Sequence, residues 1–501
     1  MKTELERTSP EAVGIPSGCI QQLLDRLESG FTQLHGIMIY RKGKICAEGW
    51  RAPYAPGQRH INASLTKTYA GTAIGIAYTQ KLLDLDERLA DIFEADIPQS
   101  QKDNPRLQRL TIRHLLMMGV GTRKQVNIPN NLIREFFEIP VEDEPGSTFL
   151  YNNMASCMLV EILKRKTKMG LHEFLKPRLF DKIGIDSENL RWELLGDIEN
   201  GAGGLYSTTE DNLRLGILYL NGGLWNGERI LAQDYVQQAM EKQNDTANWP
   251  DSYAADNFCG YGYQMWMCRP EKSCRMDGAG GQYVLLFPKQ EMAVAIHEII
   301  QRPDAPHHIM SAVFECLLPY LKPEAIEPDV SEAMKLKLRL DTLSFPRPWC
   351  RAIPDLARRI SDKIFKVTQG NVSLRNTFAM PGLTEEMKDS WEFFSLQFNA
   401  GECRLDIWKN GQNIPVDIGI DGTSRRSRVT DKLPDIVYCS GVWLDECTFE
   451  ISSRFIEENE EKKIRMNFID EGHIEIQYCT PGLSMIFGGY FQARAAEENR
   501  R

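Results

Sequence analysis

A long apolar stretch from Asn62 to Leu85 is the feature that most constrains how this chain can fold. It begins with Ser64-Leu65-Thr66-Lys67 and carries few charged side chains after that. A helix that is apolar on every side belongs in a protein interior, so we predict a buried helix here. Residues three apart lie on one face of a helix, and Ser64 and Lys67 are therefore expected to meet.

The Ser64 and Lys67 pair suits nucleophilic catalysis. Burial disfavours the ammonium form of a lysine, so a buried Lys67 could take a proton from a serine hydroxyl. A serine beside such a base is a candidate nucleophile, and the start of a helix favours developing negative charge. The S-x-x-K spacing is also expected about once by chance in a chain of this length, so the pair alone does not establish a site.

Length and composition narrow the classes of protein. The chain has 501 residues, of which 42% are hydrophobic and 26% charged, as in a globular protein of two or three domains. Its net charge of −10 argues against nucleic acid and against an anionic membrane as partners. We therefore expect neither nucleic acid nor a membrane as a partner.

The cysteines and histidines give no sign of a metal site or a cofactor. Twelve cysteines occur without a C-x-x-C pair, and eight histidines occur without metal-binding spacing. The first residues contain no apolar signal segment, and no apolar run is long enough to span a bilayer. We expect a cytoplasmic location, reduced thiols, no metal and no cofactor.

The order of segments predicts a mixture of helices and strands. We expect a helix after Ser17 and two strands between Gly36 and Trp50 that turn at Lys42-Gly43. Further helices are expected at 111–119, 154–164 and 210–220. Further strands are expected at 260–268, 284–288 and 292–300.

A proline-containing segment, 318–328, separates two parts of the chain that differ in their sequence pattern. After about residue 365 the chain gives short alternating segments between Gly, Asn and Asp turns, which predict an antiparallel β barrel or sandwich. We therefore divide the chain into a first domain at 1–320, a linker at 321–340 and a β-rich domain at 341–501.

Three separated motifs carry a family resemblance. Ser64-x-x-Lys67, Tyr151-x-Asn153 and the segment Asp277–Gln282 follow one another in this order. They resemble the S-x-x-K, Y-x-N and K-T-G motifs of the serine β-lactamase and penicillin-binding protein superfamily. The chain looks most similar to the class C β-lactamase-like branch, which includes esterases and D-aminopeptidases.

The resemblance covers roughly residues 10–315 and includes three further segments. These segments are Leu110–Leu116, Gly203–Thr208 and Leu220–Leu231. It implies an α+β fold, in which an antiparallel sheet is flanked by helices and joined to a helical subdomain. The small antiparallel β domain would follow this fold.

The resemblance also implies a role for each motif residue. Ser64 would be acylated after Lys67 takes its proton. Tyr151 would pass a proton to the leaving group and activate the deacylating water, with Lys67 favouring its phenolate. Asn153 would hold the lysine and a substrate carbonyl. The N–H groups of Ser64 and Ala279 would form an oxyanion hole, worth about 3 kcal/mol per donor.

The third motif departs from the family pattern. Met276-Asp277-Gly278 stands where Lys-Thr-Gly is expected, followed by Ala279, Gly280 and Gly281. The lysine that attracts a substrate carboxylate is missing, and so is the histidine of many related hydrolases. Arg275 is adjacent, but neighbours on a strand face opposite sides, so it is not expected to replace the lysine.

These motifs favour a serine hydrolase that acts on a small ester, amide or peptide. A β-lactamase or a D-stereospecific peptidase is the alternative. A catalytically inactive binding or sensing module of the same fold is a further one, because fold alone does not settle function. No G-x-S-x-G is present, so the nucleophile-elbow hydrolases lack their key residue. The natural substrate, the stereochemistry, the role of the β-rich domain and the oligomeric state stay open.

Overall fold

A computed structural model gives the arrangement of the chain. The residues it describes are 4–124, 131–249, 254–347, 349–374, 391–429, 435–458, 461–479 and 492–498. The chain divides into two compact units. The first unit comprises Met1–Arg51, Ala55–Glu298 and Asp304–Leu343, and the second comprises Ala52–Tyr54, Ile299–Pro303 and Ser344–Arg501.

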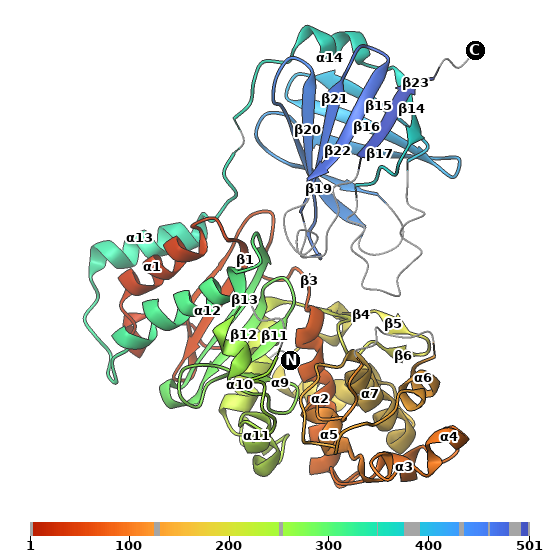
Figure 1. Cartoon of the computed structure of the whole chain (residues 1–501). Helices are drawn as coiled ribbons and strands as arrows, with labels where there is room; N and C mark the ends of the chain where they lie inside the picture. The colour runs from red at the N-terminus through yellow and green to blue at the C-terminus, as the bar shows by residue number, and fades with distance from the viewer. Residues whose placement is uncertain are drawn as a thin grey trace. The chain divides into compact units, whose positions relative to one another are not determined.

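A six-stranded sheet forms the centre of the first unit (Figure 1). Its strands, in spatial order, are β10 (Trp266–Met267), β11 (Cys274–Gly278), β12 (Gln282–Phe287), β13 (Met292–Ile300), β1 (Thr32–Arg41) and β2 (Lys44–Trp50). The predicted hairpin is confirmed, since β1 and β2 pair antiparallel around Lys42 and Gly43. The strand expected at 260–268 shrinks to β10, because Tyr261 instead exchanges backbone hydrogen bonds with Asn244.

The helices of the first unit pack on this sheet and beside it. They are α1 (Ser17–Leu27), α2 (Thr66–Thr79), α3 (Leu89–Ile92), α4 (Gln99–Lys102), α5 (Ile112–Leu116), α6 (Leu132–Glu138), α7 (Asn153–Thr167), α8 (Leu171–Leu175), α9 (Asp181–Ile183), α10 (Thr209–Leu220), α11 (Gln233–Ala239), α12 (Ala305–Cys316) and α13 (Val330–Asp341). Helices α1, α12 and α13 lie side by side, and α10 packs on β12 through Gly216 (Figure 1).

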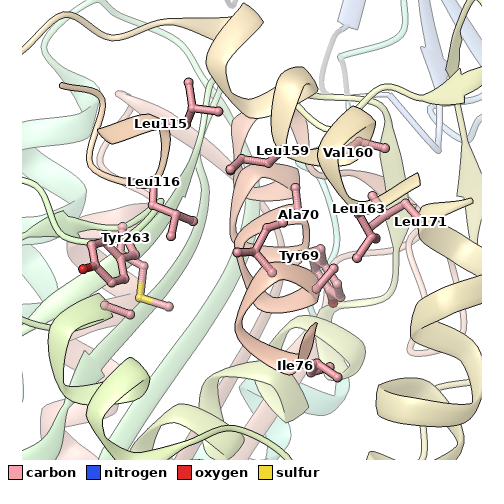
Figure 2. Close-up of a cluster of buried hydrophobic side chains, with 14 of the residues drawn as sticks. Tyr69, Ala70, Ile76, Leu115, Leu116, Leu159, Val160, Leu163, Leu171 and Tyr263 are labelled. Carbon is pink, nitrogen blue, oxygen red and sulfur yellow. The ribbon is translucent and has the colours of Figure 1, made fainter. Parts of the chain in front are cut away.

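Helix α2 is the buried centre of the helical part, as the sequence predicts. Nearly every residue from Thr66 to Ala77 is buried. Figure 2 shows Tyr69 and Ala70 of α2 among side chains of α5, α7 and α8. A Cβ on Gly75 would lie 2.4 Å from the Tyr235 ring, so only glycine lets α11 approach this closely.

Short strands complete the first unit. They are β3 (His60–Ile61), β4 (Arg191–Trp192), β5 (Leu194–Leu195), β6 (Ile198–Glu199), β7 (Leu205–Ser207), β8 (Leu224–Trp225) and β9 (Glu228–Arg229). Strands β3, β7 and β4 form a small sheet. Its strand β3 leads the chain directly into the turn that carries Ser64.

Over its described residues, the second unit is a closed β barrel of mainly antiparallel strands with one helix, α14 (Asp355–Ile360). Its strands are β14 (Ile364–Gln369), β15 (Phe393–Asn399), β16 (Glu402–Lys409), β17 (Gln412–Gly419), β18 (Arg425–Arg428), β19 (Ile436–Trp443), β20 (Thr448–Phe455), β21 (Glu461–Phe468), β22 (His473–Cys479) and β23 (Gln492–Glu497). A parallel pairing between β17, at one end of the sheet, and β19, the strand next to the other end, closes the barrel. Of the two β architectures expected from the sequence, the barrel is therefore the one observed. The expected domain at 341–501 also includes stretches outside the described residues.

The segment expected as a linker carries a helix. The compact units divide after Leu343, and α13 packs on α1 within the first unit. The expected division at 1–320, 321–340 and 341–501 stays a prediction. Among the described helices, none has the length and apolar character that a membrane crossing needs. The cytoplasmic location expected from the sequence also stays a prediction.

Candidate active site

Ser64 lies in a short 3₁₀ turn, Ala63–Leu65, immediately before α2. The backbone of Ala63 has φ of +46°, a left-handed conformation that is uncommon for a residue with a Cβ. Such strain often occurs at functional sites, where the surrounding structure has to hold it. Ala63 and Leu65 are buried, whereas Ser64 stays partly exposed. The turn thus presents the serine hydroxyl while its neighbours anchor it.

Lys67 meets Ser64, as the helical spacing predicts. Its Nζ donates a hydrogen bond to Ser64 Oγ at 2.9 Å and to the Ala202 carbonyl at 2.6 Å. Burial lowers the pKa of Lys67 to about 7, although Cys157 and Asp277 act in the opposite direction. A lysine with this pKa is substantially neutral near pH 7, so it can accept the serine proton.

Tyr151 lies beside the same lysine. Lys67 Nζ lies over the Tyr151 ring, 4.9 Å from its centroid. Burial raises the pKa of Tyr151 above its ordinary value, and hydrogen bonding to Ser64 opposes this only in part. The phenolate expected from the family resemblance is therefore disfavoured here. In this arrangement Tyr151 carries its proton and can donate it.

Asn153 lies next to the site but makes no contact that would hold Lys67. Its Oδ1 is buried and, within the described part of the chain, accepts no hydrogen bond. The Ala202 carbonyl instead accepts from Lys67. The preceding residue, Asn152, caps α7 by accepting from the N–H groups of Met154 and Ala155. The role expected for Asn153 stays a prediction.

The third motif occupies β11 and the turn that follows it. A Cβ on Gly278 would lie 2.0 Å from the Asn62 carbonyl oxygen, so the strand passes very close to the chain just before Ser64. Ala279, Gly280 and Gly281 form the turn between β11 and β12. The motif predicted from the sequence is thus adjacent to the Ser64 turn, although the oxyanion donors stay a prediction.

The side chains of β11 alternate between two faces, as in any strand. Met276 is fully buried in the hydrophobic core, while Asp277 is partly exposed. The charge of Asp277 raises the pKa values of both Lys67 and Tyr151, which places its carboxylate near the candidate site. Arg275 shares the face of Asp277 and pairs with it, with Nε 2.7 Å from Oδ2.

Aromatic side chains around Tyr151 were not assigned to the site from the sequence. Trp266 stacks on Tyr151 with ring centroids 5.6 Å apart, and Trp249 and Tyr261 meet it edge-on at 6.1 and 6.3 Å. Phe149 contacts Trp249, Tyr261 and Trp266. The aromatic content of 260–268 was visible in the sequence, but its pattern predicted a strand and not a wall of the site.

No group of three or more His, Cys, Asp or Glu side chains in the described ranges is arranged to hold a metal ion. The residues brought together are a serine, a lysine, a tyrosine and a carboxylate. Their geometry suits acyl transfer to a serine hydroxyl.

Comparison with known proteins identifies the family. A family model described as Beta-lactamase matches residues 24–308, more than half of the 501-residue chain. This chain belongs to the Beta-lactamase family. The match includes all three motifs, so the superfamily inferred from the sequence is confirmed.

This Beta-lactamase family member is similar in sequence to one named hydrolase, and solved structures of penicillin-binding protein homologues also match it. A 6-aminohexanoate-dimer hydrolase from Paenarthrobacter ureafaciens is 23% identical over 309 residues, which are 58% of this chain and 78% of that protein. A solved penicillin-binding protein from Bacillus halodurans has a TM-score of 0.44 at 17% identity, covering 58% of this chain and 99% of its own. An octameric penicillin-binding protein homologue from Pyrococcus abyssi has a TM-score of 0.44 at 13% identity, covering 95% of this chain and 98% of its own.

Proposed function

We propose that this Beta-lactamase family member is a serine hydrolase that forms an acyl-enzyme on Ser64. The observation that supports it most is the 2.9 Å contact between Ser64 Oγ and a buried Lys67 Nζ. A nucleophile within hydrogen-bond reach of a base whose pKa is about 7 is the arrangement that covalent catalysis needs. The relative named 6-aminohexanoate-dimer hydrolase supports the hydrolysis of a small molecule.

Acylation would proceed through the three side chains. Neutral Lys67 takes the hydroxyl proton while Ser64 Oγ attacks the substrate carbonyl carbon, giving a tetrahedral oxyanion. The leaving group departs with a proton from Tyr151, and Lys67 returns its proton to the phenol. The N–H groups of Ser64 and Ala279 would stabilise the oxyanion.

Deacylation would use the same groups with water as the nucleophile. Water attacks the acyl carbon and loses a proton through Tyr151 to Lys67, and that proton returns to Ser64 Oγ as the acid product leaves. The proton count balances over the cycle. No group other than water has to be supplied.

The substrate we propose is a small ester, amide or peptide, preferably with a free amino group near the scissile bond. Asp277 is partly exposed, and its charge acts on Lys67. Its Oδ2 accepts a hydrogen bond from Arg275 Nε at 2.7 Å. These features disfavour a substrate that ends in a carboxylate.

Labelling with a fluorophosphonate tests the proposal. Wild-type protein should label on the Ser64 peptide and hydrolyse short p-nitrophenyl esters. Ser64→Ala should lose labelling and lower kcat/KM by a factor on the order of 10⁴ or more. Ser147→Ala is the matched control, because Ser147 is an exposed serine outside the site.

Two results would contradict the proposed function. Labelling that persists at full rate in Ser64→Ala would place the nucleophile elsewhere. A wild-type protein that neither labels nor turns over esters, amino-acid amides or β-lactams would favour the alternative of a binding or sensing module. Efficient penicillin turnover that Ser64→Ala abolishes would support the acyl-enzyme mechanism but contradict the proposed substrate class.

A further inference from the structure

A buried ring of polar side chains adjoins the Ser64 turn. Asn212 Nδ2 donates to Asn62 Oδ1 at 2.8 Å, and Asn62 Nδ2 donates to Asn212 Oδ1 at 3.2 Å. Ser207 and Tyr69 hydroxyls each donate to Asn212 Oδ1 at 2.9 Å. All four side chains are almost completely buried. Displacing any member would leave an interior polar group unpaired, so the ring holds its geometry tightly.

Asn212 also ties this ring to the central sheet through His297 of β13. Asn212 Nδ2 lies 3.0 Å from His297 Nε2, and Thr209 Oγ1 lies 3.2 Å from His297 Nδ1. An amide nitrogen can only donate, so His297 Nε2 has to accept. The proton of a neutral His297 therefore sits on Nδ1, where it can be donated to Thr209.

Two further buried imidazoles extend the arrangement. His60 stacks on His297 with ring centroids 4.6 Å apart and an interplanar angle of 18°. His60 Nδ1 lies 3.0 Å from the Ile61 carbonyl, and His60 Nε2 lies 2.8 Å from His35 Nδ1. Since a carbonyl only accepts, His60 carries its proton on Nδ1, and His35 donates to Nε2.

Burial governs the protonation of His60 and His297. Burial lowers the pKa of His60 to about 4, against the effect of the Ile61 carbonyl. Burial also lowers the pKa of His297 well below its ordinary value, and His60 acts in the same direction. Among the described residues, His60 is the only titratable group whose charge acts on His297, and its hydrogen-bond partners from α10 are Thr209 and Asn212.

We propose that Asn212 is a positioning residue for the nucleophile: it couples neutral His297 of the sheet to Asn62, and thereby holds the Ser64 turn in its reactive geometry. The proposal rests on the proposed function of Ser64. Asn62 stands two residues before Ser64 and its carbonyl packs on Gly278, so a shift of Asn62 moves the nucleophile relative to the third motif. Protonated His297 would turn Nε2 into a donor that faces the Asn212 amide donor.

The coupling has a definite pH dependence. Below about pH 6.5 an unfolded chain protonates its histidines, whereas the buried imidazoles resist. The unfolded state then binds more protons, so stability falls as pH falls from about 6.5 toward the folded pKa of His60, about 4. Activity should show a second signature. Loss of the neutral Lys67 lowers kcat/KM about tenfold per pH unit, and protonating His297 should steepen that slope to about a hundredfold.

Asn212→Asp and Asn212→Ala test the proposal with Thr72→Val as the matched control. Thr72 Oγ1 meets Tyr219 OH at 2.9 Å, so Thr72→Val removes a buried hydrogen bond between the same two helices, α2 and α10. Asn212→Ala should lower kcat/KM on the order of 100-fold with little change in KM, because a misplaced nucleophile loses rate before binding. Thr72→Val should lower only the melting temperature.

Asn212→Asp gives the sharper result. A carboxylate beside His297 favours the imidazolium, so the steeper part of the pH profile should begin roughly one to three pH units higher than in wild type. An unchanged profile in Asn212→Asp, or a kcat/KM loss in Asn212→Ala no larger than that in Thr72→Val, would overturn the proposal.

Histidine-selective ¹⁵N NMR on the wild-type protein keeps the test independent of how the variants fold. The signal of His297 should report a neutral ring protonated on Nδ1 at pH values below the ordinary histidine pKa of about 6.5. A His297 that titrates near its ordinary pKa of about 6.5 would overturn the proposal even if the ester assays succeed. Absence of hydrolysis in the wild type would instead overturn the proposed function, while the NMR titration would still decide the state of His297.

Discussion

Arg275 and Asp277 form an ion pair along one face of β11, with Nε 2.7 Å from Oδ2. Arg275 is fully buried and also donates to the Met267 carbonyl at 3.0 Å and to Asn257. Asp277 therefore balances a buried cation with one oxygen. Its charge at the same time raises the pKa of Lys67, so the third motif acts electrostatically on the candidate base.

Asp277→Asn should shift the pH profile of the enzyme. Removing the carboxylate lowers the pKa of Lys67 below about 7, because a nearby negative charge no longer favours the ammonium. The positive charge of Arg275, no longer paired, also lowers the pKa of Lys67. More Lys67 is then neutral at low pH, and the acid limb of kcat/KM should move to lower pH, measured with an ester that has no titratable group.

The matched control is Asp143→Asn. Asp143 has a side-chain exposure of 21%, close to the 22% of Asp277, and pairs with Arg123 at 2.6 Å away from the motifs. Only Asp277→Asn should leave a buried arginine uncompensated, which costs about 3–5 kcal/mol of unfolding free energy. An acid limb that stays at the wild-type pH in Asp277→Asn would contradict the electrostatic link to Lys67.

Lys67 and Tyr151 should act as one proton relay, so their losses should not add. Tyr151→Phe removes the hydroxyl but keeps the ring beneath Lys67 Nζ, which isolates the proton-transfer role. Groups that share one relay are strongly non-additive, and the double variant with Lys67→Ala should be little worse than the poorer single variant. A double-mutant cycle on kcat/KM measures this.

Tyr78→Phe provides the reference pair for that cycle. Tyr78 lies near the other end of α2 and donates to Asp234. Its loss should add to that of Lys67→Ala within about 0.5 kcal/mol, because the two sites share no partner. Additive losses for Lys67 and Tyr151 as well would mean that the two residues act in separate steps.

Gly278→Ala should disturb the nucleophile turn directly. The new Cβ would lie 2.0 Å from the Asn62 carbonyl oxygen, so either β11 or the chain before Ser64 has to move. Overpacking of this kind costs about 1–3 kcal/mol of stability. We expect lower kcat and a lower melting temperature together. Gly57→Ala is the control, since a Cβ there meets nothing within 4 Å; equal effects of the two variants would contradict this reading.

The sequence predicted the parts of this site that depend on local spacing. Ser64 and Lys67 meet because residues three apart share a helical face, and the hairpin at Lys42-Gly43 forms as its turn residues indicate. The buried character of α2 was visible because apolar residues occur all round the helix. The barrel followed from alternating segments, although alternation alone could not separate it from a sandwich.

Long-range partners could not be read from the sequence. The Ala202 carbonyl accepts from Lys67 across 135 positions of sequence, and Asn212 meets Asn62 across 150. The periodicity of apolar residues in the sequence does not indicate such pairings, since they depend on how helices and strands pack. The depth of burial that raises the pKa of Tyr151 could not be read from the sequence for a related reason, although the effect of Lys67 was foreseen.

Substrate choice should follow from the missing lysine of the third motif. A charged hydrogen bond from such a lysine to a substrate carboxylate contributes about 1.5–3 kcal/mol. The absence of this lysine should lower the relative preference for substrates with a free carboxylate by roughly 10- to 150-fold. Met276 is buried in the core and Asp277 is the partly exposed side chain. We therefore expect short acyl esters, or amides with a free amino group, to be hydrolysed faster than substrates that end in a free carboxylate.

Matched substrates with free and methylated carboxylates measure this preference as a ratio of kcat/KM values. The methylated form should be preferred in wild type, and Asp277→Asn should reduce the preference, because repulsion by that carboxylate is removed. If only the missing lysine matters, Asp277→Asn should leave the ratio unchanged. A clear wild-type preference for the free carboxylate would contradict the prediction. It would require a cation other than Arg275, whose guanidinium is already committed to Asp277, Met267 and Asn257.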